Sequence, residues 1–156
     1  MPQDPVIYSS NLVSGITVNS PILQAPNMLL KTVVLTGAKT LTSADSGTVY
    51  SLNLAGGFTV TLPAIAAGLY FKFYVKTAPT TAYIIAANSA DVDLMTGVIV
   101  TAATGATDTE STLGADDIRF IANVALIGDS VDLWSDGTAW YARGFCTTAT
   151  GITFEG

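Results

Sequence analysis

The sequence predicts an all-β protein, either an antiparallel β-sandwich or a barrel-like domain, with an extended N-terminal arm. Short runs rich in β-branched and aromatic residues recur roughly every 8–12 residues, and turns rich in Gly and Asp separate them. No segment shows a convincing helical period. Residues 128–144 carry the strongest short-range signal: a period-2 strand, an Asp-Gly turn and a second strand with two adjacent aromatic residues. Together these patterns favour an all-β fold over a helical or mixed one.

The N-terminal segment differs from the rest of the chain. Residues 5–30 contain no charged side chain, and Pro5, Pro21 and Pro26 disfavour helix. The segment is nevertheless too apolar for a solvated disordered tail, so it forms either the first strands of the core or an arm that lies on another subunit or a larger surface. We expect an arm over residues 1–35 and a β-domain over residues 36–156. The apolar residues of the arm expected to contact a partner are Ile7, Tyr8, Leu12, Val13, Ile16, Val18, Ile22, Leu23, Met28 and Leu29.

Regular strand patterns begin at Lys31. Residues 31–35 and 39–41 are short β-branched runs, and residues 44–47 form a turn in which Gly supplies positive φ. Residues 48–54 alternate, with Tyr50 and Leu52 on one face. Residues 58–62 form the next strand, which Pro63 ends.

The cleanest half-buried strand spans residues 69–75. Leu69, Phe71, Phe73 and Val75 are expected to point inward, and Tyr70, Lys72 and Tyr74 outward. Further strands are expected at residues 83–87 and at 94–101, the latter broken at Gly97, whereas the small and polar residues 102–114 read as an exposed loop.

The C-terminal third contains the hairpin. A strand at residues 117–124 precedes it, and residues 145–154 form a final strand region. Within the hairpin, Val131, Leu133 and Ser135 share one face, and Asp132 and Trp134 share the other.

Charge is sparse in this chain. Only 12% of the 156 residues are charged, against about 25% in ordinary globular proteins, while 49% are hydrophobic. So few charges suit a protein whose surface is covered by copies of itself or by a partner. The net charge of −6 with scattered basic residues argues against nucleic-acid partners and anionic membranes. No apolar run reaches the roughly 20 residues of a membrane helix, and no export signal is evident.

Catalytic chemistry has few candidates. The chain has no His, which removes the usual Ser-His and Cys-His pairs, and its single Cys146 is expected to be a buried structural thiol. Carboxylates cluster at Asp91/Asp93, Asp108/Glu110, Asp116/Asp117 and Asp129/Asp132/Asp136. They could act as the acid and base of a glycosidase or as ligands of a turn-bound Ca²⁺, but turn formation is the favoured interpretation. We expect no catalytic residue, metal or cofactor.

Aromatic residues offer one further possibility. Tyr70, Tyr74, Trp134 and Tyr141 could make a sugar-binding platform if their strands expose them. Packing of Trp134, Trp140 and Tyr141 in the core or in a subunit interface is the favoured alternative.

Four segments in order resemble a known type of module: TLTSADSGTVY (40–50), FTVTLPA (58–64), GLYFKFYV (68–75) and GDSVDLWSDGTAWY (128–141). The chain is similar, over about residues 36–145, to small β-domains of tailed-bacteriophage virion proteins, especially capsid decoration (cement) proteins and some tail-fibre modules. The resemblance implies no enzyme activity. It implies a homotrimer on the capsid surface, assembled in the host cytoplasm, that stabilises contacts of the major capsid protein. The alternative is a tail-fibre or receptor-binding module that contacts host glycans.

Overall fold

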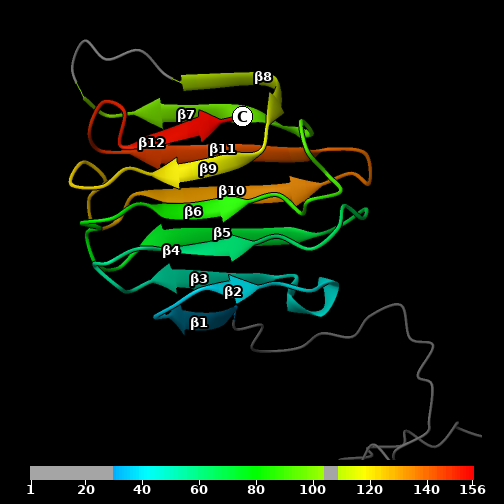
Figure 1. Ribbon diagram of the computed structural model, residues 1–156, viewed down its shortest axis with the longest axis horizontal. Coiled ribbons are helices and arrows are strands. Elements are labelled where there is room, and N and C mark those ends of the chain that lie inside the picture. The colour runs from blue at the N-terminus through cyan, green and yellow to red at the C-terminus, as the bar shows by residue number, and fades with distance from the viewer. Residues whose placement is uncertain (1–29, 104–108) are drawn as a thin grey trace, which may run out of the picture.

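The protein is a sandwich of two β-sheets (Figure 1). The computed structural model describes residues 30–103 and 109–156. The larger sheet contains, in spatial order, β1 (Lys31–Leu35), β3 (Thr48–Leu52), β5 (Tyr70–Val75), β10 (Ser130–Ser135), β11 (Trp140–Cys146), β7 (Met95–Thr101) and β8 (Thr109–Ala115). The smaller sheet contains β12 (Ile152–Glu155), β9 (Asp117–Phe120), β6 (Tyr83–Ala86), β4 (Phe58–Thr61) and β2 (Lys39–Thr40). The prediction of an all-β sandwich is confirmed.

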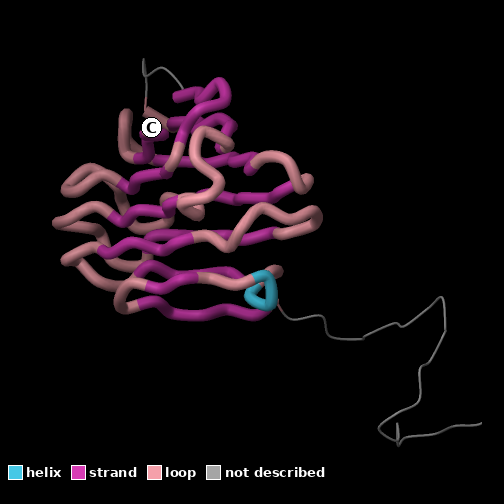
Figure 2. The backbone as a smooth tube through the Cα atoms, turned by 45° about the vertical axis from the view of Figure 1, so that its right-hand side comes forward, coloured by secondary structure: helices cyan, strands magenta, loops and turns pink. Residues whose placement is uncertain are grey.

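The first six strands alternate between the sheets. β1, β3 and β5 lie side by side in the larger sheet and run parallel, and β2, β4 and β6 do the same in the smaller sheet. Each pass of the chain therefore lays one strand in each sheet before it moves one step along the sandwich, as the layers in Figures 1 and 2 show. A strand in the opposite sheet serves as the crossover that two parallel neighbours need.

The second half of the chain completes both sheets mainly with antiparallel pairs. The β10–β11 hairpin inserts between β5 and β7. Its strand β10 runs antiparallel to β5, and its strand β11 runs parallel to β7. In the smaller sheet β9 pairs antiparallel with both β6 and β12. Both sheets are thus mixed, and the expectation of an antiparallel sandwich is wrong in this respect. Turn signals show where a strand ends, but they do not show which sheet the next strand joins.

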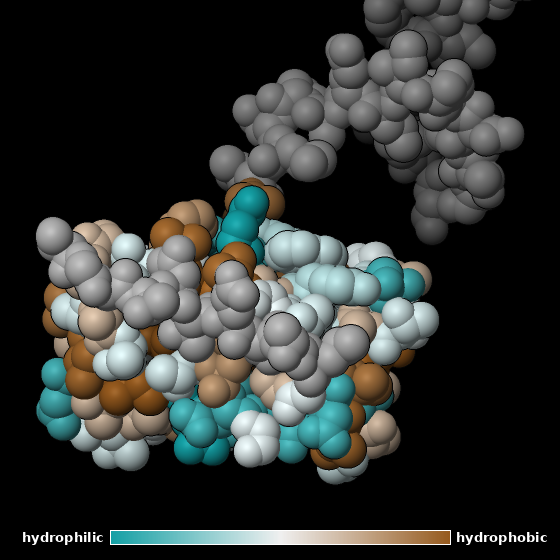
Figure 3. All heavy atoms as spheres, turned by 90° about the horizontal axis from the view of Figure 1, so that it is seen from above, coloured by the Kyte–Doolittle hydropathy of each residue, from teal (hydrophilic) through white to brown (hydrophobic). Residues whose placement is uncertain are grey.

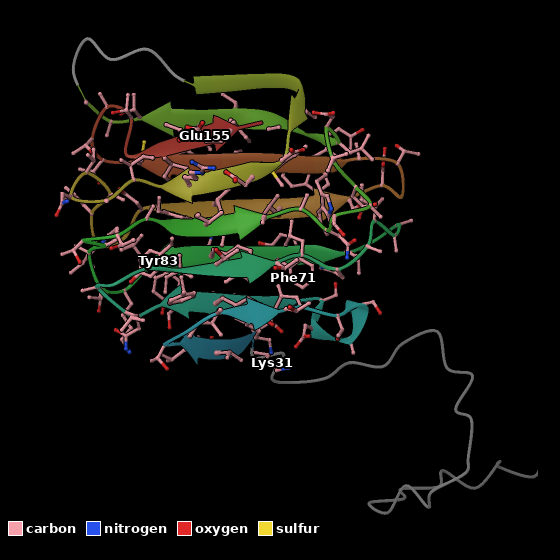
Figure 4. The ribbon with its side chains drawn as sticks, in the orientation of Figure 1. Lys31, Phe71, Tyr83 and Glu155 are labelled. Atoms are coloured by element: carbon pink, nitrogen blue, oxygen red, sulfur yellow. The ribbon has the colours of Figure 1, made fainter. Side chains whose placement is uncertain are left out.

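The core lies between the sheets and follows the predicted alternation. Phe71, Phe73 and Val75 of β5 are fully buried, as are Val131 and Leu133 of β10. Figure 4 places Phe71 and Tyr83 in the middle of the sandwich, with Lys31 at the β1 edge and Glu155 toward the opposite end. Aromatic rings contact one another in the pairs Tyr50–Phe73, Phe58–Tyr83 and Phe71–Trp140. The inward predictions for β5 and β10 are confirmed.

The hairpin forms where the sequence predicts it. Its connection spans residues 136–139, and Gly137 adopts φ 97°, which only Gly takes without strain. The Asp136 side chain stabilises this connection because its Oδ1 accepts hydrogen bonds from the backbone of Thr138 (2.8 Å) and Ala139 (3.1 Å). Asp136 is therefore a turn former, as predicted.

Three segments differ from expectation. Residues Thr109–Ala115 form the edge strand β8, although the whole of residues 102–114 was expected to be a loop. Ser43–Asp45 form a short 3₁₀ turn ahead of Gly47, which has the predicted positive φ of 79°. Lys31–Leu35, placed within the arm by the expected bounds 1–35, pair with β3 and belong to the sandwich.

Candidate functional site: the outer face of the seven-stranded sheet

The side chains that point away from the core on the larger sheet form the most distinctive surface of the molecule. Strand alternation and register place them in three rows that cross the strands. We call this surface the aromatic face, and it comprises Thr32, Val34, Val49, Ser51, Tyr70, Lys72, Tyr74, Thr96, Val98, Val100, Ser130, Asp132, Trp134, Tyr141, Arg143 and Phe145.

The first row is aromatic. Trp134 of β10 lies in register with Tyr70 of β5 on one side and with Tyr141 of β11 on the other. The rings of Trp134 and Tyr141 stack with centroids 6.1 Å apart and an interplanar angle of 20°. Trp134 remains 41% exposed. The structure therefore brings together three of the four residues considered for a sugar platform, and the fourth, Tyr74, lies on the same face four residues along β5 from Tyr70.

The middle row is ionic and centres on Asp132. Its Oδ1 accepts a hydrogen bond from the Tyr70 hydroxyl (2.6 Å), and its carboxylate pairs with Lys72 Nζ at 3.1 Å. Burial, aided by the hydrogen bond to Asp132, raises the pKa of Tyr70 to about 12. Arg143 lies opposite Asp132 in register, is exposed, and forms no ion pair with any residue in the described ranges.

The third row is apolar. Phe145 on β11 is 51% exposed and Val34 on β1 is 48% exposed, with Tyr74 and Val100 half-buried in the same row. Large exposed apolar side chains on one sheet face are typical of surfaces that another molecule covers.

The outer face of the smaller sheet is different. Its outward positions carry mostly Thr and charged residues, and Asp117 pairs with Arg119 there at 2.9 Å. We call this surface the polar face, and it comprises Thr40, Thr59, Thr61, Ile84, Ala86, Asp117, Arg119, Thr153 and Glu155. One side of the sandwich thus resembles an ordinary solvated sheet and the other does not.

The end of the molecule nearest β8 presents side chains of mixed polarity. Figure 3 shows apolar and weakly polar residues over much of the described surface there, with strongly hydrophilic residues in smaller patches. This distribution agrees with the low charge content of the chain.

Most of the predicted carboxylate clusters are built into backbone structure. Asp91 accepts from the backbone N–H of Ile65, Asp116 from that of Asp93, and Asp129 from those of Leu126 and Thr147. These acids stabilise loops, as the interpretation of the clusters as turn formers predicts.

The other acidic residues are placed differently. The turn interpretation of the clusters does not hold for Asp132 on β10 and Asp117 on β9: both lie on strands, as the strand patterns predict, and each pairs with a base. Asp108 and the side chain of Glu110 lie outside the described residues. Within residues 30–103 and 109–156, no group of three metal-binding side chains occurs.

Hydrogen bonds from neighbours control the ionisation of Asp136. The Thr138 hydroxyl, followed by backbone N–H groups, holds the pKa of the Asp136 carboxyl well below its usual range. The carboxylate also accepts a hydrogen bond from the Tyr141 hydroxyl at 3.0 Å, which ties the end of the aromatic row to the hairpin connection.

Two further side chains singled out in the sequence lie inside the protein. Cys146 is 5% exposed and donates to the Thr148 carbonyl oxygen at 3.3 Å, as expected of a buried structural thiol. Trp140 is fully buried and belongs to the core, unlike its neighbour Tyr141 on the aromatic face. The Trp140 indole N–H has no hydrogen-bond partner in the described part of the chain.

The ten apolar residues from Ile7 to Leu29 that were expected to contact a partner lie outside the described residues. The aromatic face was predicted only in part, as a possible sugar-binding platform of Tyr70, Tyr74, Trp134 and Tyr141, while packing of Trp134, Trp140 and Tyr141 in the core or in a subunit interface was the favoured alternative. A further signal was the outward set Tyr70, Lys72 and Tyr74 on β5, which joins Trp134 and Tyr141 because β10 lies beside β5 and β11 beside β10.

Wider comparisons add no relatives. Within the described residues no helix is both long and apolar enough to cross a membrane. No protein-family model matches the chain, and no curated protein matches it.

Proposed function

We propose that the chain is a structural protein of the bacteriophage virion: a capsid decoration, or cement, protein that binds the outer shell as a homotrimer. It is assembled in the host cytoplasm, binds the major capsid protein and stabilises the contacts between its copies. The observation that carries this proposal is the aromatic face on a chain with only 12% charged residues. Such a surface suits permanent contacts, because obligate interfaces resemble a domain core cut in half.

The proposal assigns no enzyme activity and no cofactor. Five of the described acids considered for catalysis are engaged by backbone N–H groups or by a neighbouring base: Asp91, Asp116, Asp117, Asp129 and Asp132. The mechanism is stabilisation by mass action: a protein that binds only the assembled shell raises the resistance of that shell by its binding free energy. Three linked copies multiply the effect through avidity.

The N-terminal residues 1–30 supply the contact with the shell. Residues 5–30 of this segment are uncharged and rich in apolar side chains, and a segment of this kind can add a strand to an exposed sheet edge of a neighbouring protein. Deletion of residues 1–30 should leave a folded trimer that no longer co-sediments with purified capsids lacking the protein. The full-length protein is the control, and capsid binding by the truncated protein at the full-length level would contradict this role.

A second function has its own support. Tyr70, Trp134 and Tyr141 in one row are the kind of side chains that stack on sugar rings, which favours a tail-fibre or receptor-binding module that contacts host glycans. Copy number separates the two functions. Quantitative mass spectrometry of purified virions should find a copy number comparable with that of the major capsid protein for a decoration protein, and only a few copies for a tail component.

A further inference from the structure

We propose that three copies of the chain associate through the aromatic face, each turning its seven-stranded sheet toward a common threefold axis. The inference rests on the trimer of the proposed function and names the surface that makes it. Three features of the described residues carry it: the contrast between the two outer faces, the distribution of side-chain size across the larger sheet, and the pairing of Asp132 with Lys72 in the ionic row.

The contrast between the faces shows which side is covered. Both sheets have the same core on their inner sides, so the composition of the outer sides is free to differ. The polar face carries four Thr residues and the Asp117–Arg119 pair. The aromatic face carries Trp134, Phe145 and Val34, which are 41%, 51% and 48% exposed. Trp, Tyr and Arg, the residue types most enriched at binding hot spots, are all present on the aromatic face.

Side-chain size varies across the aromatic face in a way that fits a threefold axis. The large residues lie on β5, β10 and β11 in the middle of the sheet, among them Tyr70, Trp134 and Tyr141. The flanking strands β1, β3 and β7 carry only Thr, Ser and Val on this face. The side chains therefore project furthest from the sheet at its centre.

Simple geometry connects this gradient to three copies. Seven strands spaced about 4.8 Å apart make a sheet about 34 Å wide, and three such sheets arranged as a triangle lie about 10 Å from their common axis. Two sheets packed face to face are each only about 5 Å from the plane between them. The triangle therefore needs large side chains at the sheet centre, next to the axis, and small ones at the flanks where neighbouring sheets converge. The strand at the centre of the sheet is β10, the fourth of seven.

The ionic row meets most of the electrostatic requirement of such a contact. A buried charge without a counter-charge is costly. Asp132 already pairs with Lys72, and Arg143 lies in the same row. Of the three charged side chains described in this row, only Arg143 has no counter-charge.

The contact is tested first by solution mass. Light scattering or native mass spectrometry should give a trimer for the full chain. Trp134→Glu places a charge next to the axis and should weaken the trimer by about 30-fold or more, the factor that corresponds to the loss of a hot spot. Ile84→Glu, the matched control on the half-buried outward side of β6, should remain trimeric. Circular dichroism verifies that both variants fold.

Cross-linking tests the same surface without disrupting it. Cys146 is buried, so a new surface thiol reacts against a low background. Ser130→Cys on the outer side of β10 should be joined between copies by a bifunctional maleimide, and Thr59→Cys on the polar face should not.

The outcomes separate this inference from the proposed function. A trimer that persists in Trp134→Glu and cross-links through Thr59→Cys overturns the aromatic face as the contact and leaves the trimer intact. A dimer overturns the threefold arrangement. A monomer at all concentrations overturns both proposals. In that case, a Ser130→Cys thiol that does not react with maleimide would mean that the chain's own N-terminal residues cover the face. A thiol that reacts would leave the face to an external partner such as a glycan.

Discussion

At the scale of single residues, Asp132 determines how the centre of the aromatic face is built. One carboxylate holds the Tyr70 hydroxyl at 2.6 Å and Lys72 Nζ at 3.1 Å across two adjacent strands. Cross-strand pairs of this kind stabilise sheets modestly when exposed, and more when the acid is shielded, as it is here with its side chain 11% exposed. Loss of the carboxylate would leave a phenol and an ammonium without their shared partner.

Tyr70 also makes the stability of the protein depend on pH in the alkaline range. Burial and Asp132 raise its pKa to about 12, from 10.0 in the unfolded chain. The folded state therefore keeps a proton that the unfolded state loses, so the free energy of unfolding should fall as the pH rises from about 10 through 12. Tyr50, whose pKa burial also raises to about 12, adds to the same trend.

Urea unfolding at a series of pH values measures this effect. Tyr70→Phe should show a shallower decline than the wild type between pH 10 and 12, because one of the contributing groups is gone. Asp132→Asn should fall between the two, since burial, the larger cause of the Tyr70 shift, remains while the carboxylate is removed. Identical slopes for all three proteins would show that Tyr70 titrates normally in the folded state.

At the scale of elements, the contact between β7 and β11 depends on Gly97. The two strands run parallel with Gly97 opposite Ala142, and a Cβ at position 97 would run into the backbone of Ala142. Gly97 was expected to break its strand, but β7 pairs with β11 without interruption and is irregular only toward β8, between Met95 and Gly97. The glycine thus permits a close approach of two backbones.

Gly97→Ala should therefore destabilise the protein by about 1–3 kcal/mol, the usual cost of forcing an extra carbon into a packed site. The measurement is the free energy of unfolding from denaturant titration. Gly37→Ala is the matched control, because a Cβ there meets nothing within 4 Å and the backbone has no positive φ. Equal midpoints for the two variants would mean that β7 shifts away from β11 at little cost.

The sequence predicts elements of this fold better than it predicts their connections. Period-2 alternation identified the inner and outer sides of β5 and β10 because it records burial of one face directly. It contains no information on the pairing partner, so the parallel course of β1, β3 and β5 could not be read from it. β8 was missed because TESTLGA is an edge strand without the bulky alternation of a core strand. The aromatic face was predicted in part: its aromatic residues were named and the hairpin joins Trp134 to Tyr141, but nothing in the sequence places β5 beside β10.

At the scale of the whole molecule, the two outer faces explain how so few charges can suffice. Eighteen charged residues are too few to keep every surface of a 156-residue monomer separate from its neighbours. If the aromatic face is covered by other copies, the charges need to serve only the polar face and the loops. Low charge and an apolar sheet face are then consequences of one requirement, which is permanent association.

Permanent association has a thermal consequence. When unfolding also separates three chains, higher protein concentration favours the folded trimer, so Tm should rise by about 3 °C for each tenfold increase in concentration of a chain of this size. Trp134→Glu, which weakens the proposed contact at the axis, should unfold at a lower Tm than the wild type at each concentration. Ile84→Glu on the polar face should keep the concentration dependence of the wild type. Scanning calorimetry over a hundredfold range of concentration measures all three, and a concentration-independent Tm for the wild-type protein would show that each sandwich is stable without its neighbours.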